Sequence, residues 1–377
     1  MAGIKGEFEL YTEKEAFFNC AFLAALANGN TIIHEVKATP EFADFASYLR
    51  DLGAQVYVKD EQWEIAGTNF KYKKPLNLEW IGDDFPYQKR NKKIIECLLD
   101  GIAFNCEEKI PVKDSLIKEL ATYGVELEWR QDCQEESDEL AKRMAKLHGI
   151  KNERKWVCNI PPVPSLLARD RFIAGDATHG AFLALAASLI PDSDIIIKTV
   201  NLDSARAGIF GAFRRLGADI EVVARHEKEH SVWGDLRVKS SKMLLGRRLG
   251  AEVLFTCLDE IPLLSVLACF ADGETILKIP VWAIDFYKPV FAAIYENLKI
   301  AGVECGLYED GLILRGKEEI EADGFDCKGL PVLGLALHIL NKKAKGKQEI
   351  KGIEFIGNTW PNAIFNWEWN EQPEAGN

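Results

Sequence analysis

The sequence predicts an α/β protein built from a repeated helix–strand–helix–strand–strand unit and divided into two domains. The first observation behind this prediction is the recurring order of an Ala- and Leu-rich helix, a β-branched strand, an amphipathic helix and one or two short strands. The second is the glycine that follows each amphipathic helix, as expected of a helix C-terminal cap, at Gly53, Gly124, Gly217 and Gly302. Self-similarity of this kind indicates a repeat architecture.

The repeat is clear in residues 21–66, weaker in 94–129, and clear again in 181–238 and 263–315. Residues 131–172 lack the pattern, because they hold an acidic helical stretch followed by a proline-rich link, NIPPVPSLLARDR. We therefore expect the domain that contains them to be reduced in size.

Length and composition restrict the class of protein. A chain of 377 residues is long enough for two domains with their own cores. No apolar run approaches the roughly 20 residues of a membrane span, and the start, MAGIKGEFELYTEKE, is too polar for a signal peptide. The net charge of −12 argues against a nucleic-acid partner, and nine cysteines without a CxxC pair predict reduced thiols. We expect a cytoplasmic protein without cofactor or membrane contact; the sequence does not predict its oligomeric state.

One segment has the letters of a metal site. His226-Glu-Lys-Glu-His230 reads HExxH, the zinc-protease signature, in which both histidines lie on one face of a helix. Here the segment lies between two strand-like stretches, IEVVA and SVWGDLRV. We therefore expect a hairpin loop and no metal site.

The stretch with the strongest chemical signal is 251–278, AEVLFTCLDEIPLLSVLACFADGETILK. We expect a β-type run that ends at Asp259 and Glu260, then a buried helix after Pro262, then a strand. Adjacent carboxylates cost several kcal/mol each when they are buried without partners, so their position predicts a cleft. The structural alternative is that they cap the helix that contains Pro262.

This stretch resembles the "DEIP…A…GET" element of the enolpyruvyl transferases, and of EPSP synthase in particular. AGDATHGAFLALAAS (174–188) is similar to that family's "GD-S-A--FL-AA", and NLDSARAGIFGAFRRLGADIEV (201–222) to its "N--R-G----LR-MGA-I". The resemblance implies a two-domain inside-out α/β barrel, in which βαβαββ units surround central helices. It also implies that residues 1–12 plus 174–377 form the first domain and that 13–173 form the inserted, reduced one.

The resemblance implies that Lys14 and Asp259 transfer protons at a carbocyclic substrate and face each other across the cleft, with Glu260 beside Asp259. A lysine and a carboxylate on opposite sides of a small polyol are suited to act as general acid and base. We expect the neighbouring carboxylates Glu13 and Glu15 to keep Lys14 protonated.

The motifs that hold phosphoenolpyruvate in this family have changed. Its "SKS---R" element falls on residues 13–19, its "NAGT---R" loop on 87–93, where the glycine is absent, and its "R-K--DR" element on 284–290. Phosphoenolpyruvate is a compact anion that the family binds with bidentate guanidinium contacts, so these changes disfavour its binding. The polar residues that remain as candidates for binding substrate are Glu15, Asn19, Lys93, Arg90, Asp176, His179, Arg206 and Lys288.

Three functions are open. The first is an enzyme that keeps a shikimate-like polyol, abandons phosphoenolpyruvate and uses Lys14 and Asp259 for acid/base elimination or isomerisation. The second is an inactive family member that binds a metabolite or a partner. The third is a divergent enolpyruvyl transferase that uses Lys93, Arg90, Arg206 and Lys288 as its cations. The retained acid and base favour the first over the second, and the lost arginines disfavour the third.

Overall fold

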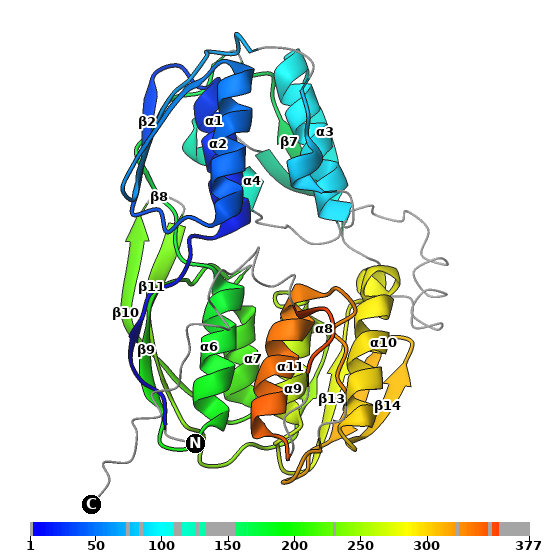
Figure 1. Ribbon diagram of the computed structural model, residues 1–377. Helices are drawn as coiled ribbons and strands as arrows, with labels where there is room; N and C mark the ends of the chain where they lie inside the picture. Colours follow the sequence, from blue (N-terminus) through cyan, green and yellow to red (C-terminus); the bar gives the residue numbers. More distant parts are fainter. Residues whose placement is uncertain are drawn as a thin grey trace, which may run out of the picture. The chain divides into compact units, whose positions relative to one another are not determined.

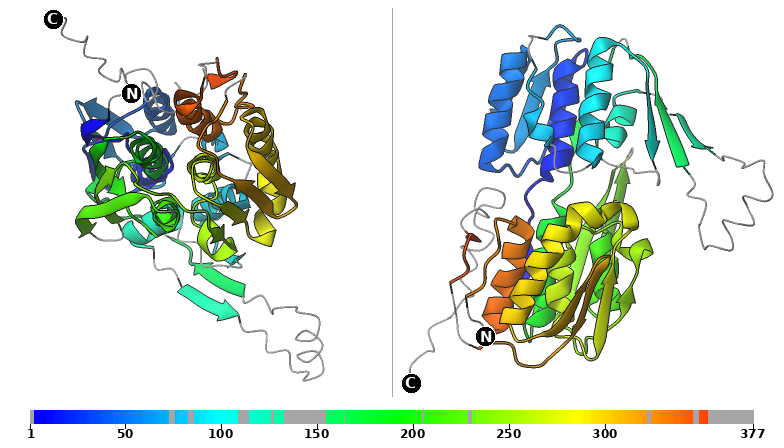
Figure 2. Two further views of the ribbon diagram at one scale, coloured as in Figure 1. Left: turned by 90° about the horizontal axis from the view of Figure 1, so that it is seen from below. Right: turned by 90° about the vertical axis from the view of Figure 1, so that its right-hand side faces the viewer.

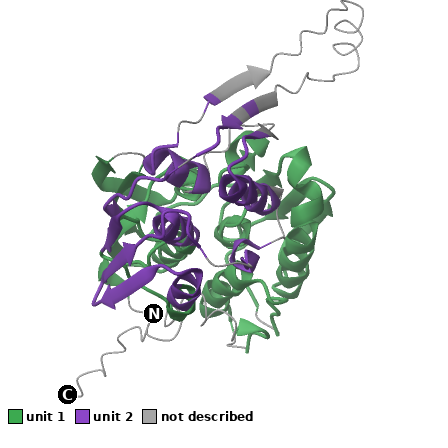
Figure 3. Cartoon of the chain, turned by 90° about the horizontal axis from the view of Figure 1, so that it is seen from above, with its two compact units in different colours: residues 1–14, 35–45, 172–377 green, residues 15–34, 46–171 purple. Residues whose placement is uncertain are grey.

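The computed structural model describes residues 3–72, 76–82, 86–108, 115–125, 128–132, 155–163, 165–204, 206–228, 231–321, 324–345 and 349–353. Contacts divide the chain into two compact units, drawn in two colours in Figure 3. Unit 1 comprises Met1–Lys14, Glu35–Phe45 and Phe172–Asn377, and unit 2 comprises Glu15–His34 and Ala46–Arg171. The predicted domains, residues 1–12 plus 174–377 and residues 13–173, are meant as units of folding. A grouping by contacts does not test this, so they stay a prediction.

Unit 1 contains two copies of the predicted repeat. The first copy consists of α6 (Ala177–Leu189), β9 (Asp194–Asn201), α7 (Gly208–Arg215), β10 (Asp219–Lys228) and β11 (Ser231–Lys239). The second consists of α9 (Ile261–Ala268), β13 (Glu274–Lys278), α10 (Ile284–Ile300), β14 (Glu304–Tyr308) and β15 (Gly311–Arg315). Each copy contributes a four-stranded sheet, with β1 (Lys5–Phe8) in the order β1-β9-β11-β10 and β12 (Arg248–Leu249) in the order β12-β13-β15-β14.

The helices α6, α9 and α11 (Pro331–Lys343) pack side by side in the interior of unit 1 (Figure 1), and Figure 2 shows them along their axes. Every residue of α6 and of α9 is buried. A helix surrounded by protein needs no polar face, which explains why these segments are apolar all round. The predicted α/β fold with helices inside its sheets is therefore confirmed in this unit.

Unit 2 repeats the same order of elements. One copy, of which residues 14 and 40–45 are grouped with unit 1, consists of α1 (Lys14–Leu26), β2 (Asn30–His34), α2 (Pro40–Leu52), β3 (Gln55–Lys59) and β4 (Gln62–Ala66). The other consists of the short helix η1 (Glu79–Ile81), α3 (Pro86–Asp100), β5 (Phe104–Glu108), α4 (Ser115–Thr122), β6 (Glu128–Asp132) and β7 (Lys155–Ile160). The sheets run β3-β4-β2-β8 and β5-β7-β6, with β8 at Arg171–Phe172. The predicted acidic helix at 135–149 lies outside the described residues.

The four glycines predicted to end helices have the required backbone conformation. Their φ angles are 109° at Gly53, 89° at Gly124, 100° at Gly217 and 68° at Gly302. Only glycine adopts positive φ without steric cost, so each position stops its helix as the sequence indicates.

Two local predictions need correction. The expected strand before Asp259 is instead the short helix α8 (Ala251–Leu254) and a turn, because Gly250 is extended (φ −89°, ψ 179°) and places Ala251 at a helix start. His226 lies within β10, where its ring stacks on Trp233, and not in the hairpin loop. The hairpin itself is present, since β10 and β11 pair up to Lys228 and Ser231. His230 lies outside the described residues.

Among the described residues, no helix is both long and apolar enough to cross a membrane.

Candidate functional site

The two carboxylates that precede α9 have opposite environments. Glu260 occupies the N-cap position of α9, but its side chain makes no capping hydrogen bond. It turns inward, is only 2% exposed, and accepts a hydrogen bond of 2.5 Å from the hydroxyl of Thr178 on α6. Asp259 lies one residue earlier and is partly exposed, so one carboxylate is inside unit 1 and the other is at its surface.

Asp259 is held on both sides. Its Oδ1 accepts a hydrogen bond of 2.5 Å from the hydroxyl of Tyr287 on α10, and its Oδ2 lies 3.7 Å from Nη1 of Arg206. Since its side chain bonds to Tyr287 and Glu260 makes no cap bond, the capping alternative for this pair is wrong.

Glu13 connects this pair to the N-terminal segment. Its carboxylate is buried, with Oε1 2.8 Å from Nε of Arg206 and Oε2 accepting a hydrogen bond from the side-chain amide of Asn201. The backbone N–H of Glu13 donates to the carbonyl of Ala174 at 3.0 Å, which fixes where the side chain begins. Glu13, Arg206 and Asp259 thus form a chain of alternating charge, which we call the Glu13–Arg206–Asp259 cluster.

The turn after β9 positions Asn201 and Arg206. The Asn201 side-chain oxygen accepts the Asp203 N–H at 2.9 Å, and the Arg206 N–H donates to the Asp203 carbonyl at 2.9 Å. Just before this turn, Thr199 has a φ of 52°, a costly conformation for a β-branched residue, and Asp235 accepts its N–H at 3.0 Å. A constrained backbone therefore directs both side chains toward Glu13.

Burial changes the acid–base properties of Glu260. Loss of hydration, with a smaller contribution from the neighbouring charge of Asp259, raises the pKa of Glu260 from 4.5 to about 7, although Arg206 and the Thr178 hydroxyl favour the charged form. A carboxyl group in this state holds a proton about half of the time near neutral pH, next to the partly exposed Asp259.

Lys14 is the first residue of α1, and its side chain is 43% exposed. Its ammonium forms an ion pair with Glu41 of α2. The two Glu13 oxygens contact Arg206 and Asn201, and the expectation that Glu13 and Glu15 keep Lys14 protonated stays a prediction. That Lys14 and Asp259 face each other stays a prediction.

Asp176 and His179 begin α6. Asp176 is the N-cap residue and accepts the His179 N–H at 2.9 Å. The His179 ring is buried, stacks on Tyr11 with ring centroids 5.6 Å apart, and its Nδ1 has no hydrogen-bond partner among the described residues. Burial lowers the pKa of His179 to about 4, so the ring is neutral near pH 7. Substrate binding by these two residues stays a prediction.

The remaining candidates are Lys288 in unit 1 and four residues in unit 2. Lys288 is exposed on α10 of unit 1. Glu15, Asn19, Arg90 and Lys93 belong to unit 2. There Asn19 is buried in α1, Arg90 donates to the side-chain oxygen of Asn91, and Lys93 pairs with Glu96 at 3.1 Å. The segment 87–93, where the resemblance suggested a loop, lies inside α3.

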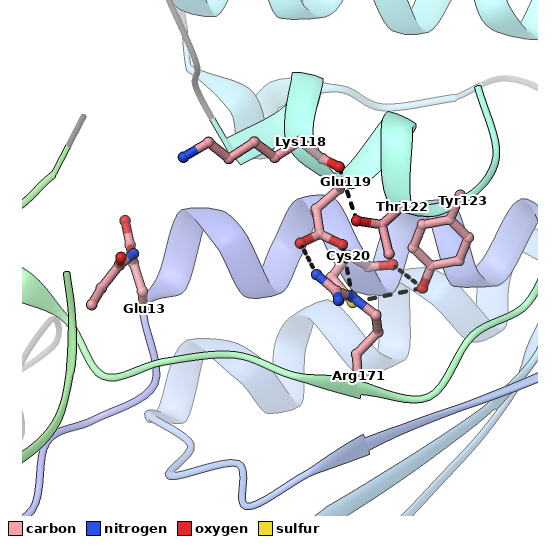
Figure 4. A network of polar contacts seen from close by, with 8 residues as sticks. Glu13, Cys20, Lys118, Glu119, Thr122, Tyr123 and Arg171 are labelled. Carbon is pink, nitrogen blue, oxygen red and sulfur yellow. Dashed lines mark hydrogen bonds and ion pairs between the residues drawn. The ribbon is translucent and has the colours of Figure 1, made fainter. Parts of the chain in front are cut away.

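Unit 2 has a buried ion pair of its own (Figure 4). Arg171 Nη2 lies 2.6 Å from Glu119 Oε1, and its Nε donates to Glu119 Oε2 at 3.1 Å. Close by, the Tyr123 hydroxyl donates to the carbonyl of Cys20 at 3.2 Å. The Arg171 and Glu119 side chains are 3% and 6% exposed, so this pair is enclosed by protein.

No group of three or more His, Cys, Asp or Glu side chains that could hold a metal ion occurs in the part of the chain that the structure describes.

Four polar residues in or beside the Glu13–Arg206–Asp259 cluster were not among the predicted site residues. Thr178 stands at the serine of the quoted motif "GD-S", and Asn201 opens the quoted NLDSARAG segment, so both had a signal. Tyr287 lies within the altered 284–290 segment, which was considered only for its missing arginines and not for its tyrosine hydroxyl. Glu13 had no local signal, because nothing in TEKE separates its buried carboxylate from the half-exposed Lys14 and Glu15.

Comparison with known proteins places this geometry in context. Residues 117–367 match the family model described as EPSP synthase (3-phosphoshikimate 1-carboxyvinyltransferase). The 3-phosphoshikimate 1-carboxyvinyltransferase of Synechococcus sp. is 30% identical over 51% of this chain and 43% of its own length. That of Persephonella marina is 24% identical over 88% of this chain and 90% of its own. The chain thus spans about half the length of several relatives and nearly all of another.

Solved structures show the same fold. The EPSP synthase of Acinetobacter baumannii superposes with a TM-score of 0.75 and 16% identity, over 96% of this chain and 94% of that one. The enolpyruvyl transferase NikO of Streptomyces tendae does so with a TM-score of 0.65 and 12% identity, over 97% and 93%. Because the family model covers more than half of the sequence, the chain belongs to the EPSP synthase family.

Proposed function

We propose that the protein transfers a carboxyvinyl group to a hydroxyl of a cyclic polyol, the class of reaction for which its relatives are named. Membership of the family supports this over the elimination that the altered motifs first favoured. The observation that carries the proposal within the molecule is Asp259, a partly exposed carboxylate fixed by Tyr287 and adjacent to Arg206.

Carboxyvinyl transfer from phosphoenolpyruvate forms a C–O bond between the acceptor oxygen and the donor's C2 and breaks the bond from C2 to phosphate oxygen. The hydroxyl proton of the acceptor leaves, in the overall balance, with inorganic phosphate. A base at the acceptor hydroxyl and an acid at the donor's methylene carbon assist these steps. Asp259 Oδ2 is the base in this proposal, and Lys14 is the acid. Glu260, with its raised pKa, is a second carboxyl that holds a proton next to the base.

The donor is an anion and requires cations. The family's arginines are absent at 19 and in 284–290, so the proposal assigns this role to Lys14, Lys93 and Lys288. An ammonium binds phosphate as a point charge, without the paired geometry of a guanidinium. We therefore expect weak binding of phosphoenolpyruvate.

A second candidate is the loss of water from the polyol without any donor. The observation that favours it is Glu13, whose carboxylate neutralises the cation nearest to Asp259. In this reaction Asp259 removes a proton from a ring carbon and an acid gives a proton to the leaving hydroxyl on the adjacent carbon. A C=C bond forms and water is released, so no oxidant or cofactor is required.

One assay separates the two. The protein is incubated with shikimate or shikimate 3-phosphate, with and without phosphoenolpyruvate, while inorganic phosphate and product mass are measured. Transfer predicts phosphate release and a carboxyvinyl mass increase that depend on phosphoenolpyruvate. Elimination predicts the loss of one water without it. Absence of both products contradicts both candidates.

The role of Asp259 has a matched control. Asp259→Asn should lower the rate at least ~10²-fold, the lower end of the contribution from a positioned base. Asp310 is also partly exposed and pairs with a cation, Lys278, at 2.6 Å, but lies between β14 and β15. Asp310→Asn should leave the rate unchanged, and an equal loss in both variants would contradict the assignment.

A further inference from the structure

A β-bulge near the end of β9 connects the sheet of unit 1 to the Glu13–Arg206–Asp259 cluster. We propose that Asp235, on β11, is a positioning residue for the reaction at Asp259. Its side chain holds the bulge, and the bulge directs Asn201 to Glu13. This role rests on the proposed function for the reaction, whereas the bulge is a feature of the structure.

The pairing between β9 and β11 shows the bulge. The two strands pair in register on both sides of Asp235, but the stretch of β9 between the paired positions is one residue longer. Lys198 and Thr199 therefore both lie opposite the single Asp235, the arrangement that defines a β-bulge. The bulge requires an unusual backbone, since Thr199 has a φ of 52° that is costly for a β-branched residue.

Asp235 contacts both residues of the bulge. Its Oδ1 accepts the backbone N–H of Thr199 at 3.0 Å, and its Oδ2 forms an ion pair with the ammonium of Lys198. Burial acts to raise the pKa of Asp235, but the bonds from Lys198 and Thr199 outweigh it and lower the pKa, so the carboxylate is charged near pH 7. The side chain is only 15% exposed, so water competes little for these bonds.

The bulge decides which face of β9 carries Asn201. Ile195 and Ile197 are buried, so strict alternation along the strand would place Asn201 on the same buried face. The extra residue shifts the alternation by one position, and Val200 is fully buried instead. Asn201 then lies on the opposite face, where its side-chain amide donates to Glu13.

Asn201 transmits this geometry to the cluster through two contacts. Its side-chain oxygen accepts the N–H of Asp203, in the turn that carries Arg206. Its amide contacts one oxygen of Glu13, whose other oxygen lies 2.8 Å from Nε of Arg206. Arg206 in turn lies 3.7 Å from Asp259. A strand without the bulge would lose both contacts of Asn201, and the cation beside Asp259 would lose this support.

The test uses Asp235→Ala in the full chain, with amide hydrogen exchange and turnover as its two readouts. Without the carboxylate, Thr199 should relax toward negative φ, so amide exchange of a peptide that covers residues 199–206 should rise at least about tenfold. In the product assay with phosphoenolpyruvate, kcat should fall about tenfold while KM stays within about twofold, because a displaced reacting group affects the reaction more than substrate binding.

Two control substitutions isolate the hydrogen bond to Thr199. Asp235→Asn keeps an oxygen that can accept this bond and removes only the charge opposite Lys198, so both readouts should stay within about threefold of the unaltered protein. Asp194→Ala breaks a pair with Arg237 of 2.6 Å that joins the same two strands outside the bulge, and it should change neither readout. Equal effects of Asp235→Ala and Asp194→Ala would overturn the proposal.

Thr199→Gly tests the backbone strain directly. Glycine adopts positive φ without steric cost, so the bulge depends less on Asp235 when residue 199 is glycine. Added to Thr199→Gly, Asp235→Ala should change kcat and exchange by about threefold or less. An undiminished effect would overturn the assignment. If Asp235→Ala alone does not fold, recovery of a folded protein by Thr199→Gly would support the role, and no recovery would overturn it.

The two readouts keep this result separate from the proposed function. Increased exchange with an unchanged kcat would leave the transfer intact and overturn the positioning role. If the unaltered protein forms neither product, the proposed function fails and the role in the reaction fails with it, while the exchange data still decide whether Asp235 holds the bulge.

Discussion

Among the described residues, the glutamate–arginine pairs Glu119–Arg171 and Glu13–Arg206 differ in what surrounds them. In unit 2, Glu119 and Arg171 face each other through two contacts and are almost fully enclosed. In unit 1, Glu13 is as buried as Glu119, but Arg206 is 30% exposed and reaches on to Asp259, which is 35% exposed. The first pair is almost fully closed to solvent. The second pair continues to a partly exposed carboxylate, Asp259.

The difference follows from the positions of the arginines. Arg171 lies on β8 and is held against α4 by the sheet. Arg206 lies in the turn between β9 and α7, where a backbone hydrogen bond to Asp203 holds it and its side chain is 30% exposed. Loops carried by a rigid scaffold are the common location of functional groups, and this pair conforms to that rule.

The largest expected effect comes from removing one charge of the buried Glu119–Arg171 pair. Arg171→Met leaves Glu119 charged and buried without a counter-ion, which should lower the free energy of unfolding by roughly 3–5 kcal/mol. Urea unfolding followed by circular dichroism measures it. The exposed pair of Lys345 and Glu319 provides the control, because Lys345→Met should change stability by about 0.5 kcal/mol or less.

A double substitution sharpens this test. Arg171→Met combined with Glu119→Leu removes both charges, so it should recover most of the stability that the single change loses. A double variant less stable than Arg171→Met would show that the loss of stability does not come from the unpaired charge of Glu119. That result would contradict our explanation of the single substitution.

The next effect uses the proton on Glu260. Burial raises its pKa to about 7, so between pH 4.5 and 7 the folded protein keeps a proton that the unfolded chain releases. The stabilisation is therefore complete below pH 4.5 and is lost as the pH rises through 7. Relative to Glu260→Gln, the protein should lose on the order of 2 kcal/mol of unfolding free energy between pH 5 and pH 8.

The comparison with Glu260→Gln matters because other groups titrate in the same range. Burial lowers the pKa of His179 and of His338 to about 4, which removes stability as the pH falls below about 6.5. Both histidines remain in the variant, so their effect cancels in the difference. Urea unfolding of the two proteins at pH 5 and pH 8 gives the result, and a difference that does not change with pH would refute the role of Glu260.

The sequence predicted the repeat and its helix stops because both depend on local patterns. Apolar periodicity indicated the interior helices α6 and α9, and Gly53 and Gly217 ended their helices through backbone conformation alone. The predicted strand before Asp259 failed because an apolar run of this length does not distinguish a strand from a short helix and a turn.

The candidate site was predicted in part. Asp259, Glu260 and Arg206 were found because they stand on recognisable segments. The partners that set their properties were not, since Glu13 and Asn201 are 188 positions apart and meet only through the fold. A pattern of residue types cannot show that a glutamate near the N-terminus neutralises an arginine of the β9–α7 turn. Sequence reasoning therefore weighed elimination against transfer on the lost arginines and the retained acid and base, without this contact.

The smallest expected effect concerns Tyr287, whose hydroxyl bonds to one carboxylate oxygen of Asp259 while Arg206 lies near the other. Tyr287→Phe removes the hydroxyl that donates to Asp259 Oδ1 and leaves the ring in place. The Asp259 carboxylate then has one fixed neighbour, Arg206 at 3.7 Å, and is free to rotate away from the acceptor. Positioning of this kind affects the reacting arrangement more than substrate binding. We expect kcat of the proposed reaction to fall about tenfold while KM stays within about twofold.

Tyr295 provides the matched control, because it lies two turns further along the same helix and is only half-buried. Tyr295→Phe makes the identical chemical change on α10, so a general effect of losing a hydroxyl from this helix would lower kcat in both variants. A fall in kcat restricted to Tyr287→Phe would show that the hydrogen bond from Tyr287 orients Asp259. The Glu119–Arg171 pair of unit 2 is instead held in place by its burial. A change in KM with kcat preserved would instead make Tyr287 a binding group, and the assignment of Asp259 as an oriented base would lose its support.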